Sequence, residues 1–160
     1  MHMVYHVASS ILPVKLLAQV RVLQRDAFPG KTIDMANYAY VVLVQQAGTI
    51  IGSACVREHE PAAARTLESL CVLSGFQRKG VGSSILEYIT NELSDLPMAL
   101  HVDAGYRHDR LVDFYSMRGF EQSYTNDRET MLVKPARNGA GLSEDEYAAL
   151  QTVRCNFRIV

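Results

Sequence analysis

The sequence lacks an excess of charge of either sign. Its 160 residues carry 16 lysines and arginines against 17 aspartates and glutamates, which gives a formal net charge of −1 with neutral histidines. A chain this balanced has no overall electrostatic attraction to nucleic acid or to an anionic membrane surface. We therefore expect no nucleic acid and no membrane as partner.

Long apolar runs are also missing. The N-terminal region has Ile11 with Leu12 and Leu16 with Leu17, but no uninterrupted apolar stretch and no small-residue cleavage pattern. Neither a signal peptide nor a membrane span is indicated. The length suits one domain with a single sizeable core. We expect a soluble cytoplasmic protein.

The sequence has few cysteines, and they do not have the spacing of metal ligands. Cys55, Cys71 and Cys155 are an odd number, and the first two fall inside strand-like runs, as buried thiols in a reducing compartment do. His101 and His108 have no cysteine or carboxylate at ligand spacing either. We expect no metal site.

A glycine-containing motif between a strand and a helix is the most informative feature present. The strand-like stretch 67–73 ends at Ser74 and Gly75, and an apolar stripe that predicts a helix covers 81–94. Between them lie Gln77, Arg78, Lys79, Gly80, Val81 and Gly82. Glycine lets a ligand approach the backbone, and the first turn of a helix presents free amides with the positive end of its dipole. The motif predicts a pyrophosphate site, with a plain strand-to-helix turn as the alternative.

The motif lacks what other nucleotide loops require. A dinucleotide fold would have a third glycine after Ser83 and Ser84, and a P-loop would have Gly-Lys-Ser/Thr in that order. Gln/Arg-x-x-Gly-x-Gly/Ala instead resembles the acyl-CoA loop of the GNAT superfamily of N-acyltransferases. The resemblance implies acetyl-CoA as cofactor.

A second segment of the chain is similar to the same family. It reads Phe114, Tyr115, Ser116, Met117, Arg118, Gly119 and Phe120, and its Gly119 suits the left-handed residue that ends a helix. The family resemblance implies that Tyr115 lies near the thioester sulfur and protonates the departing CoA thiolate. The alternative interpretation is a core tyrosine.

The resemblance covers about residues 4 to 134 and implies a fold. Patterns predict helices at 14–27, 81–94 and 108–118, and strands at 38–44, 50–56, 66–73, 98–103, 120–125 and 129–134. Residues 45–49 read as a hairpin turn. The expected fold class is α+β: a single GNAT-like domain with a mixed central sheet flanked by helices on both faces.

Two carboxylates are candidate general bases, because an amine attacks a thioester only when it is neutral. Glu68 interrupts an apolar strand, where a carboxylate is costly unless it is solvated, paired or used; its alternative is a salt bridge. Asp103 ends the strand 98–103, twelve residues before Tyr115, and some family members that acetylate protein N-termini have an acidic base there. Its alternative is loop or helix capping ahead of Gly105.

The family resemblance also assigns the coenzyme contacts. The main chain of Leu70, Cys71, Val72 and Leu73 would pair with the pantetheine arm, in a slot where this strand splays from 98–103. Gln77, Arg78, Lys79, Gly80, Val81, Gly82 and Ser83 would hold the pyrophosphate. His108 stands where members often have an asparagine that contacts pantetheine, so this contact is a departure from the family.

We expect residues 1–135 to form the acyltransferase domain and 136–160 a C-terminal extension. In the extension, Ser143 and Glu146 form a capping-box pattern for a short helix from 142 to about 153, and 155–160 alternate like a strand. This extension would pack on the domain or on a second subunit, which makes a homodimer one possible assembly. The expected function is acetyl transfer from acetyl-CoA to a primary amine of a small molecule or of a protein or peptide. The alternative is a non-catalytic CoA-binding module of the same fold.

Overall fold

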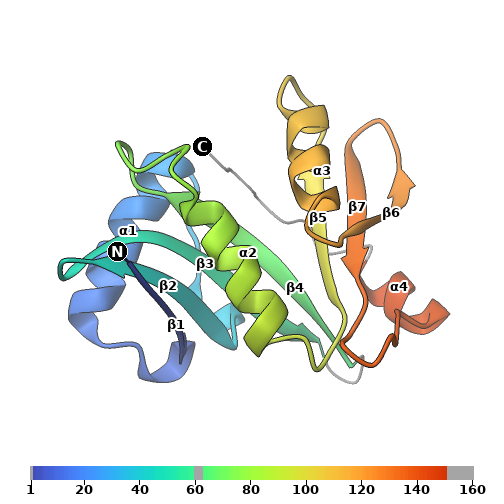
Figure 1. Cartoon of the computed structure of the whole chain (residues 1–160), viewed down its shortest axis with the longest axis horizontal. Coiled ribbons are helices and arrows are strands. Elements are labelled where there is room, and N and C mark those ends of the chain that lie inside the picture. The colour runs from blue at the N-terminus through green and yellow to red at the C-terminus, as the bar shows by residue number, and fades with distance from the viewer. Residues whose placement is uncertain (1, 60–62, 151–160) are drawn as a thin grey trace.

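A computed structural model describes residues 2–59 and 63–150 of the chain. These residues form one mixed sheet of seven strands in the order β1-β2-β3-β4-β5-β7-β6 (Figure 1). The strands are β1 (Met3–Ala8), β2 (Tyr40–Gln46), β3 (Thr49–His59), β4 (Ala64–Val72), β5 (Met98–Asp103), β6 (Glu121–Thr125) and β7 (Glu129–Lys134). The β4–β5 pair is parallel, and the other neighbours are antiparallel. The predicted mixed sheet is confirmed.

Helices cover both faces of the sheet, as predicted. They are α1 (Val14–Ala27), α2 (Val81–Glu92), α3 (His108–Ser116) and α4 (Glu144–Leu150), with short 3-10 turns at Ser9–Ile11 and Met35–Asn37. The apolar stripe of α1 packs on β3 and β4, with Val20 and Leu23 fully or almost fully buried. On the opposite face, α2 covers β1 to β4 and α3 covers β5 and β7. An apolar core therefore lies on each side of the sheet.

Local sequence signals explain most element boundaries. The predicted hairpin between β2 and β3 is present, and Ala47 and Gly48 both have positive φ, 49° and 80°, as a type I′ turn requires. Gly119 has a φ of 90° and follows the end of α3, as predicted. The strand β1 was not predicted, because a short segment whose residues are exposed or only half-buried carries a weak apolar signal.

The helix α4 lies on the half of the sheet that contains β5 and β7 (Figure 1). Ser143 and Glu146 form a reciprocal capping box at its start, with backbone-to-side-chain distances of 3.2 Å in both directions. At its end, Leu150 is fully buried among Ala64, Ala99, Met131 and Val133. The predicted continuation of this helix to 153 and the strand 155–160 lie outside the described residues.

Replacing Leu150 with alanine should lower the free energy of unfolding. We expect a loss of about 2 to 3 kcal/mol, at the lower end for a buried leucine because the end of a short helix can relax. Thermal and urea unfolding measure this loss. Met117→Ala is the control, since Met117 is 83% exposed. Equal stability of the two variants would show that α4 does not pack on the sheet in solution.

The described cysteines match the sequence expectation. Cys55 and Cys71 are free, buried thiols. Burial raises the pKa of Cys71 to about 11, so this thiol is protonated and unreactive at neutral pH. Cys155 lies outside the described residues. Of the helices in residues 2–59 and 63–150, none is both long and apolar enough to span a membrane.

Candidate active site

The sheet splits between β4 and β5. These parallel strands pair through Arg65 with Met98 and Thr66 with Ala99, and the pairing then stops although β4 continues to Val72 and β5 to Asp103. The carboxyl ends of the two strands therefore diverge. The backbone of β4 beyond Thr66 borders this split. The family resemblance implied a slot beside residues 70–73, and a coenzyme contact there stays a prediction.

A bulge on β4 changes the direction of the backbone along the split. The register between β3 and β4 shifts after Ser53, and Ser69 has a φ of 54° although it is not a glycine. Such strained residues cost about 1 to 3 kcal/mol and cluster at functional sites. This bulge could not be predicted from the sequence, because serine has no special preference for positive φ.

The predicted glycine motif forms a tight turn between β4 and α2. The amide of Phe76 donates to the Leu73 carbonyl, and Arg78 and Gly80 both adopt left-handed backbone conformations, with φ of 61° and 81°. Gly80 is the N-cap of α2, so the first helical turn opens directly from the motif. On the sheet side, a Cβ added to Gly52 would lie 2.7 Å from Val81 Cγ1. Gly52 is thus what lets the start of α2 sit close to β3.

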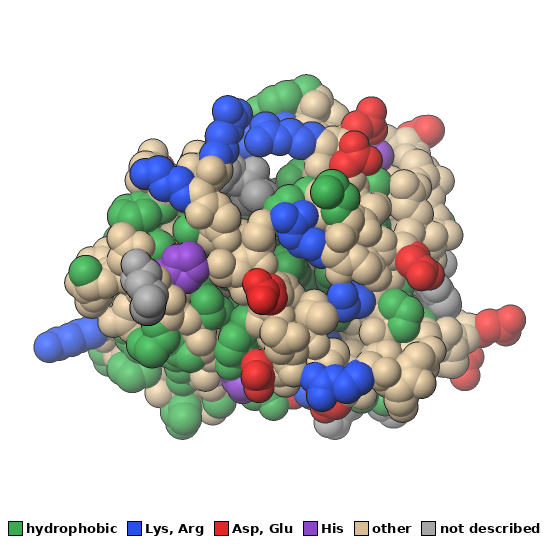
Figure 2. Space-filling model, in the orientation of Figure 1, with side chains coloured by type: hydrophobic (Ala, Val, Ile, Leu, Met, Phe, Trp, Pro, Cys, Tyr) green, Lys and Arg blue, Asp and Glu red, His purple; other side chains and the backbone are tan. Residues whose placement is uncertain are grey.

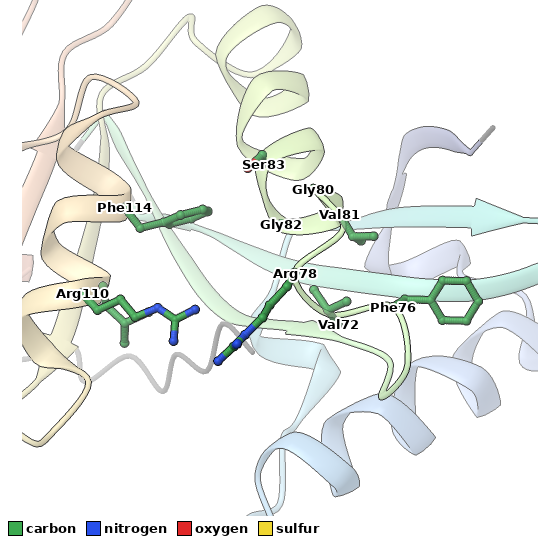
Figure 3. Close-up of a pocket in the computed structure, with 10 residues that line it drawn as sticks. Val72, Phe76, Arg78, Gly80, Val81, Gly82, Ser83, Arg110 and Phe114 are labelled. Atoms are coloured by element: carbon green, nitrogen blue, oxygen red, sulfur yellow. The ribbon is translucent and has the colours of Figure 1, made fainter.

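A pocket opens where this turn faces α3. Its volume is about 130 Å³. It is lined by Val72, Phe76, Arg78, Gly80, Val81, Gly82, Ser83, Arg110, Leu111 and Phe114 (Figure 3). Arg78 and Arg110 project into the same space from opposite walls (Figure 3), and basic side chains lie on both rims of the hollow in the space-filling view (Figure 2). The pocket joins an apolar wall to two guanidinium groups and a helix N-terminus, which suits an anionic ligand with an apolar arm.

Some of the predicted coenzyme-binding residues line the pocket, and others do not. Six of them line the pocket: Val72, Arg78, Gly80, Val81, Gly82 and Ser83. Leu70, Cys71 and Leu73 belong to β4 or directly follow it, and the Gln77 side chain donates to the Val72 carbonyl at 3.4 Å. Lys79 instead lies over the Phe76 ring, 5.7 Å from its centroid. Arg110 was missed, because an exposed arginine in a helical pattern reads as a solvated side chain.

His108 lies outside the set that lines the pocket. Its Nε2 is 2.6 Å from the Thr130 hydroxyl on β7, and its Nδ1 is 2.9 Å from Asp109. In this structure His108 ties the start of α3 to the sheet. Its proposed contact with pantetheine stays a prediction.

The two walls of the pocket are connected by Arg118, which follows α3. Its guanidinium donates to Ser83 Oγ at 2.6 Å and to the Phe114 carbonyl at 2.8 Å, and it lies over the Phe114 ring at 3.9 Å. This contact spans the split on the face that α2 and α3 cover. The Ser83 hydroxyl is therefore engaged by protein as well as exposed to the pocket.

Tyr115 is fully buried on the α3 side of the split. Its ring makes edge contacts with Phe114 and Phe120, with centroid distances of 5.3 and 5.7 Å. These contacts fix the ring in one position. Both interpretations of Tyr115, a core residue and a proton donor, are compatible with this packing.

Glu68 lies on the opposite face of the sheet, within a polar network. Arg57 Nε donates to it at 2.8 Å, Thr66 Oγ1 at 3.0 Å and the Tyr38 hydroxyl at 3.4 Å. The Glu68 side chain is only 3% exposed whereas that of Arg57 is 29% exposed, so the carboxylate is nearly desolvated and the guanidinium still reaches solvent. The salt-bridge interpretation of Glu68 is present in the structure, and a role as base stays a prediction.

His101 shares that face of the sheet with Glu68. It is fully buried, and neither ring nitrogen has a hydrogen-bond partner within residues 2–59 and 63–150. Its Nε2 lies 3.8 Å from a Glu129 carboxylate oxygen. Burial lowers the His101 pKa, and the charges of Glu68 and Asp103 partly oppose this shift. A buried neutral imidazole beside three carboxylates is a natural proton acceptor.

Asp103 is exposed at the end of β5 and, by strand alternation, points to the same face as His101. It does not cap α3, whose N-cap is Arg107. Helix capping by Asp103 is therefore absent from the structure, whereas loop capping by Asp103 and its role as base stay predictions. No group of three or more metal-ligating side chains is placed to bind a metal among the described residues.

The lowered pKa of His101 predicts a pH dependence of stability. The unfolded imidazole binds a proton near pH 6.5, whereas the folded one does so at lower pH, so the free energy of unfolding should fall as pH drops below about 6.5. His101→Gln should flatten this dependence. Urea unfolding between pH 7 and 5 measures the slope. A variant that keeps the full wild-type slope would contradict the assignment.

Comparison with known proteins relates this chain to a family. The sequence matches a family model described as an acetyltransferase (GNAT) domain over residues 18–134. No curated protein matches the sequence.

Solved structures share the fold at low sequence identity. Naa50 of Arabidopsis thaliana, in complex with the bisubstrate analogue CoA-Ac-MVNAL, has a TM-score of 0.66 and 22% identity, over 82% of this chain and 97% of that one. The ribosomal-protein-S18-alanine N-acetyltransferase of Escherichia coli has a TM-score of 0.66 and 18% identity, over 89% and 98%. Escherichia coli ElaA also has a TM-score of 0.66 and 18% identity, over 84% and 99%. At sequence identities this low, the structural similarity establishes a common fold and nothing more.

Proposed function

Since the chain belongs to the GNAT acetyltransferase family, we propose that it transfers an acetyl group from acetyl-CoA to a primary amine within a ternary complex. The observation that carries this proposal is the pocket in which the Arg78-containing turn and the start of α2 face α3 across the β4–β5 split. The strained residue Ser69 lies on β4 three residues before Val72, which lines this pocket. Strained backbone close to a binding pocket is typical of catalytic sites, and it favours an enzyme over a static binding module.

The coenzyme fits the pocket by its chemistry. The pyrophosphate would meet the amides that begin α2 and the guanidinium of Arg78. The pantetheine arm would run along Leu70 to Leu73 as an added strand, which brings the thioester towards the bulge at Ser69. Backbone amides there would polarise the thioester carbonyl as its oxygen gains charge.

We propose the following proton path for the reaction. The neutral amine forms a C–N bond to the acetyl carbon, and the C–S bond then breaks. The amine proton passes to His101 or to one of its neighbours Glu68 and Asp103, directly or through water, and the thiolate takes a proton from Tyr115. The contacts of Glu68 with Arg57 and Thr66 favour His101 as the first acceptor, with the carboxylates stabilising the imidazolium.

The acceptor is a primary amine of a small molecule or of a protein or peptide. Two of the similar structures are described as a complex with a peptide bisubstrate analogue and as a ribosomal-protein acetyltransferase, which supports the protein or peptide class. The buried, protonated thiols Cys55 and Cys71 support a reducing, cytoplasmic setting. The extension 136–160 is proposed to pack on the domain through α4, and a homodimer remains part of this proposal.

A thermal-shift titration tests the coenzyme part of the proposal. Acetyl-CoA and CoA should each stabilise the chain, by roughly 2.7 kcal/mol at about 100 times the dissociation constant. NAD, which shares the adenosine and pyrophosphate, should give a smaller shift because it has no pantetheine arm. Equal shifts with NAD, or none with either CoA ligand, would contradict the proposal.

A further inference from the structure

The wall of the pocket opposite the glycine turn contributes its own cation. Arg110 lies on α3, and Figure 3 shows its guanidinium and that of Arg78 projecting into the space between α3 and the turn. The two residues belong to different halves of the split sheet, because α2 follows β4 whereas α3 packs on β5 and β7. A ligand held by both arginines therefore bridges the two halves.

Neither guanidinium is paired with a carboxylate in the part of the chain that the structure describes. Within residues 2–59 and 63–150, no ion pair or side-chain hydrogen bond of Arg78 or Arg110 is present. By contrast, Arg57 pairs with Glu68, Arg65 with Asp95, and Arg118 donates to Ser83. Two unpaired guanidinium groups that share a pocket repel each other until an anion lies between them.

The charge of the proposed ligand exceeds what the turn can neutralise. The sequence assigned both Arg78 and Lys79 to the pyrophosphate, but Lys79 lies over Phe76 and does not line the pocket. Together, the Arg78 guanidinium and the α2 amides can balance the two negative charges of a pyrophosphate diester. CoA also carries a 3′-phosphate monoester, which holds between one and two further negative charges at neutral pH. Planar guanidinium groups bind such phosphates through paired, charge-assisted hydrogen bonds.

We infer that Arg110 binds the 3′-phosphate of the coenzyme and so makes the enzyme select CoA over 3′-dephospho-CoA. This inference rests on the proposed function, since it needs CoA in the pocket. Arg110 is a specificity residue in this account and has no part in the chemical step. It would bind the 3′-phosphate end of the coenzyme and leave the thioester to other residues.

Calorimetric titration with CoA and with 3′-dephospho-CoA tests the inference on four proteins. The wild type should bind CoA at least about 10-fold more tightly than dephospho-CoA, the usual size of one hydrogen-bonded contact to a charged group. Arg110→Gln should weaken CoA binding by about that factor and leave dephospho-CoA binding unchanged. Arg78→Gln should weaken both ligands. Arg128→Gln, which removes the same charge at the exposed β6–β7 turn, should bind both ligands as the wild type does.

Three outcomes would overturn the inference. Equal weakening of both ligands by Arg110→Gln would place Arg110 on the pyrophosphate, and no weakening would remove it from the site. A wild type that binds CoA but does not discriminate dephospho-CoA would also exclude a 3′-phosphate contact, while leaving the proposed acetyl transfer intact. A wild type that binds neither ligand would instead refute the proposed function itself.

Discussion

Tyr115→Phe should lower the turnover of acetyl transfer by about 10²- to 10⁴-fold, the usual contribution of a positioned proton donor. The change removes one oxygen and keeps the ring, whose contacts with Phe114 and Phe120 hold it in place. We therefore expect the fold and the affinity for acetyl-CoA to stay near wild type. Single-turnover kinetics and calorimetric titration with acetyl-CoA separate the two effects.

The matched control for this prediction is Tyr106→Phe. Tyr106 is 90% exposed and precedes α3, so loss of its hydroxyl should leave turnover unchanged. Unchanged turnover in Tyr115→Phe would remove Tyr115 from the role of acid. A fall in coenzyme affinity that accounts for the whole loss would make it a binding residue.

Glu68→Ala should lower the free energy of unfolding by about 1.5 to 3 kcal/mol, because it removes a buried carboxylate that accepts hydrogen bonds from the partly exposed Arg57. The hydroxyls of Thr66 and Tyr38 lose an acceptor in the same change. For a domain of this size, thermal unfolding should shift down by roughly 2 to 4 °C for each kcal/mol. Urea unfolding gives the free energy directly.

A second variant separates structure from catalysis at this position. Arg57→Met combined with Glu68→Leu removes both charges and should recover much of the lost stability. If the paired variant is stable and active, Glu68 is a structural partner of Arg57. If it is stable and its turnover falls by more than about 100-fold, Glu68 takes part in proton transfer. A Glu68→Ala protein as stable as wild type would contradict the buried ion pair.

Much of the fold could be predicted because its local signals agree with its tertiary structure. The apolar stripe at 14–27 forms α1 with those bounds, and the turn at Ala47 and Gly48 joins two strands as expected. The turn that ends in Gly80 also forms as predicted, because glycine is suited to the positive φ found there. These features depend on near neighbours in the chain.

The parts of the site that escaped prediction depend on contacts between distant segments. The positive φ of Ser69 is imposed by the bulge against β3, and a serine in the sequence does not predict such a bulge. Two partners of Glu68, Arg57 and Tyr38, come from β3 and from the loop before β2. The sequence alone therefore could not distinguish a salt-bridge role of Glu68 from a role as catalytic base. Arg110 joins the pocket only because α3 packs across the split from the glycine turn.

The most direct test of acetyl transfer is the release of free thiol from acetyl-CoA in the presence of an amine panel. The panel contains small amines, amino acids and short peptides with free N-termini, with the full chain as enzyme. We predict thiol release that depends on both enzyme and amine, saturates with acetyl-CoA and is lost in Tyr115→Phe. Tight binding of acetyl-CoA with no amine-dependent thiol release across the panel would contradict the account and favour a CoA-binding module.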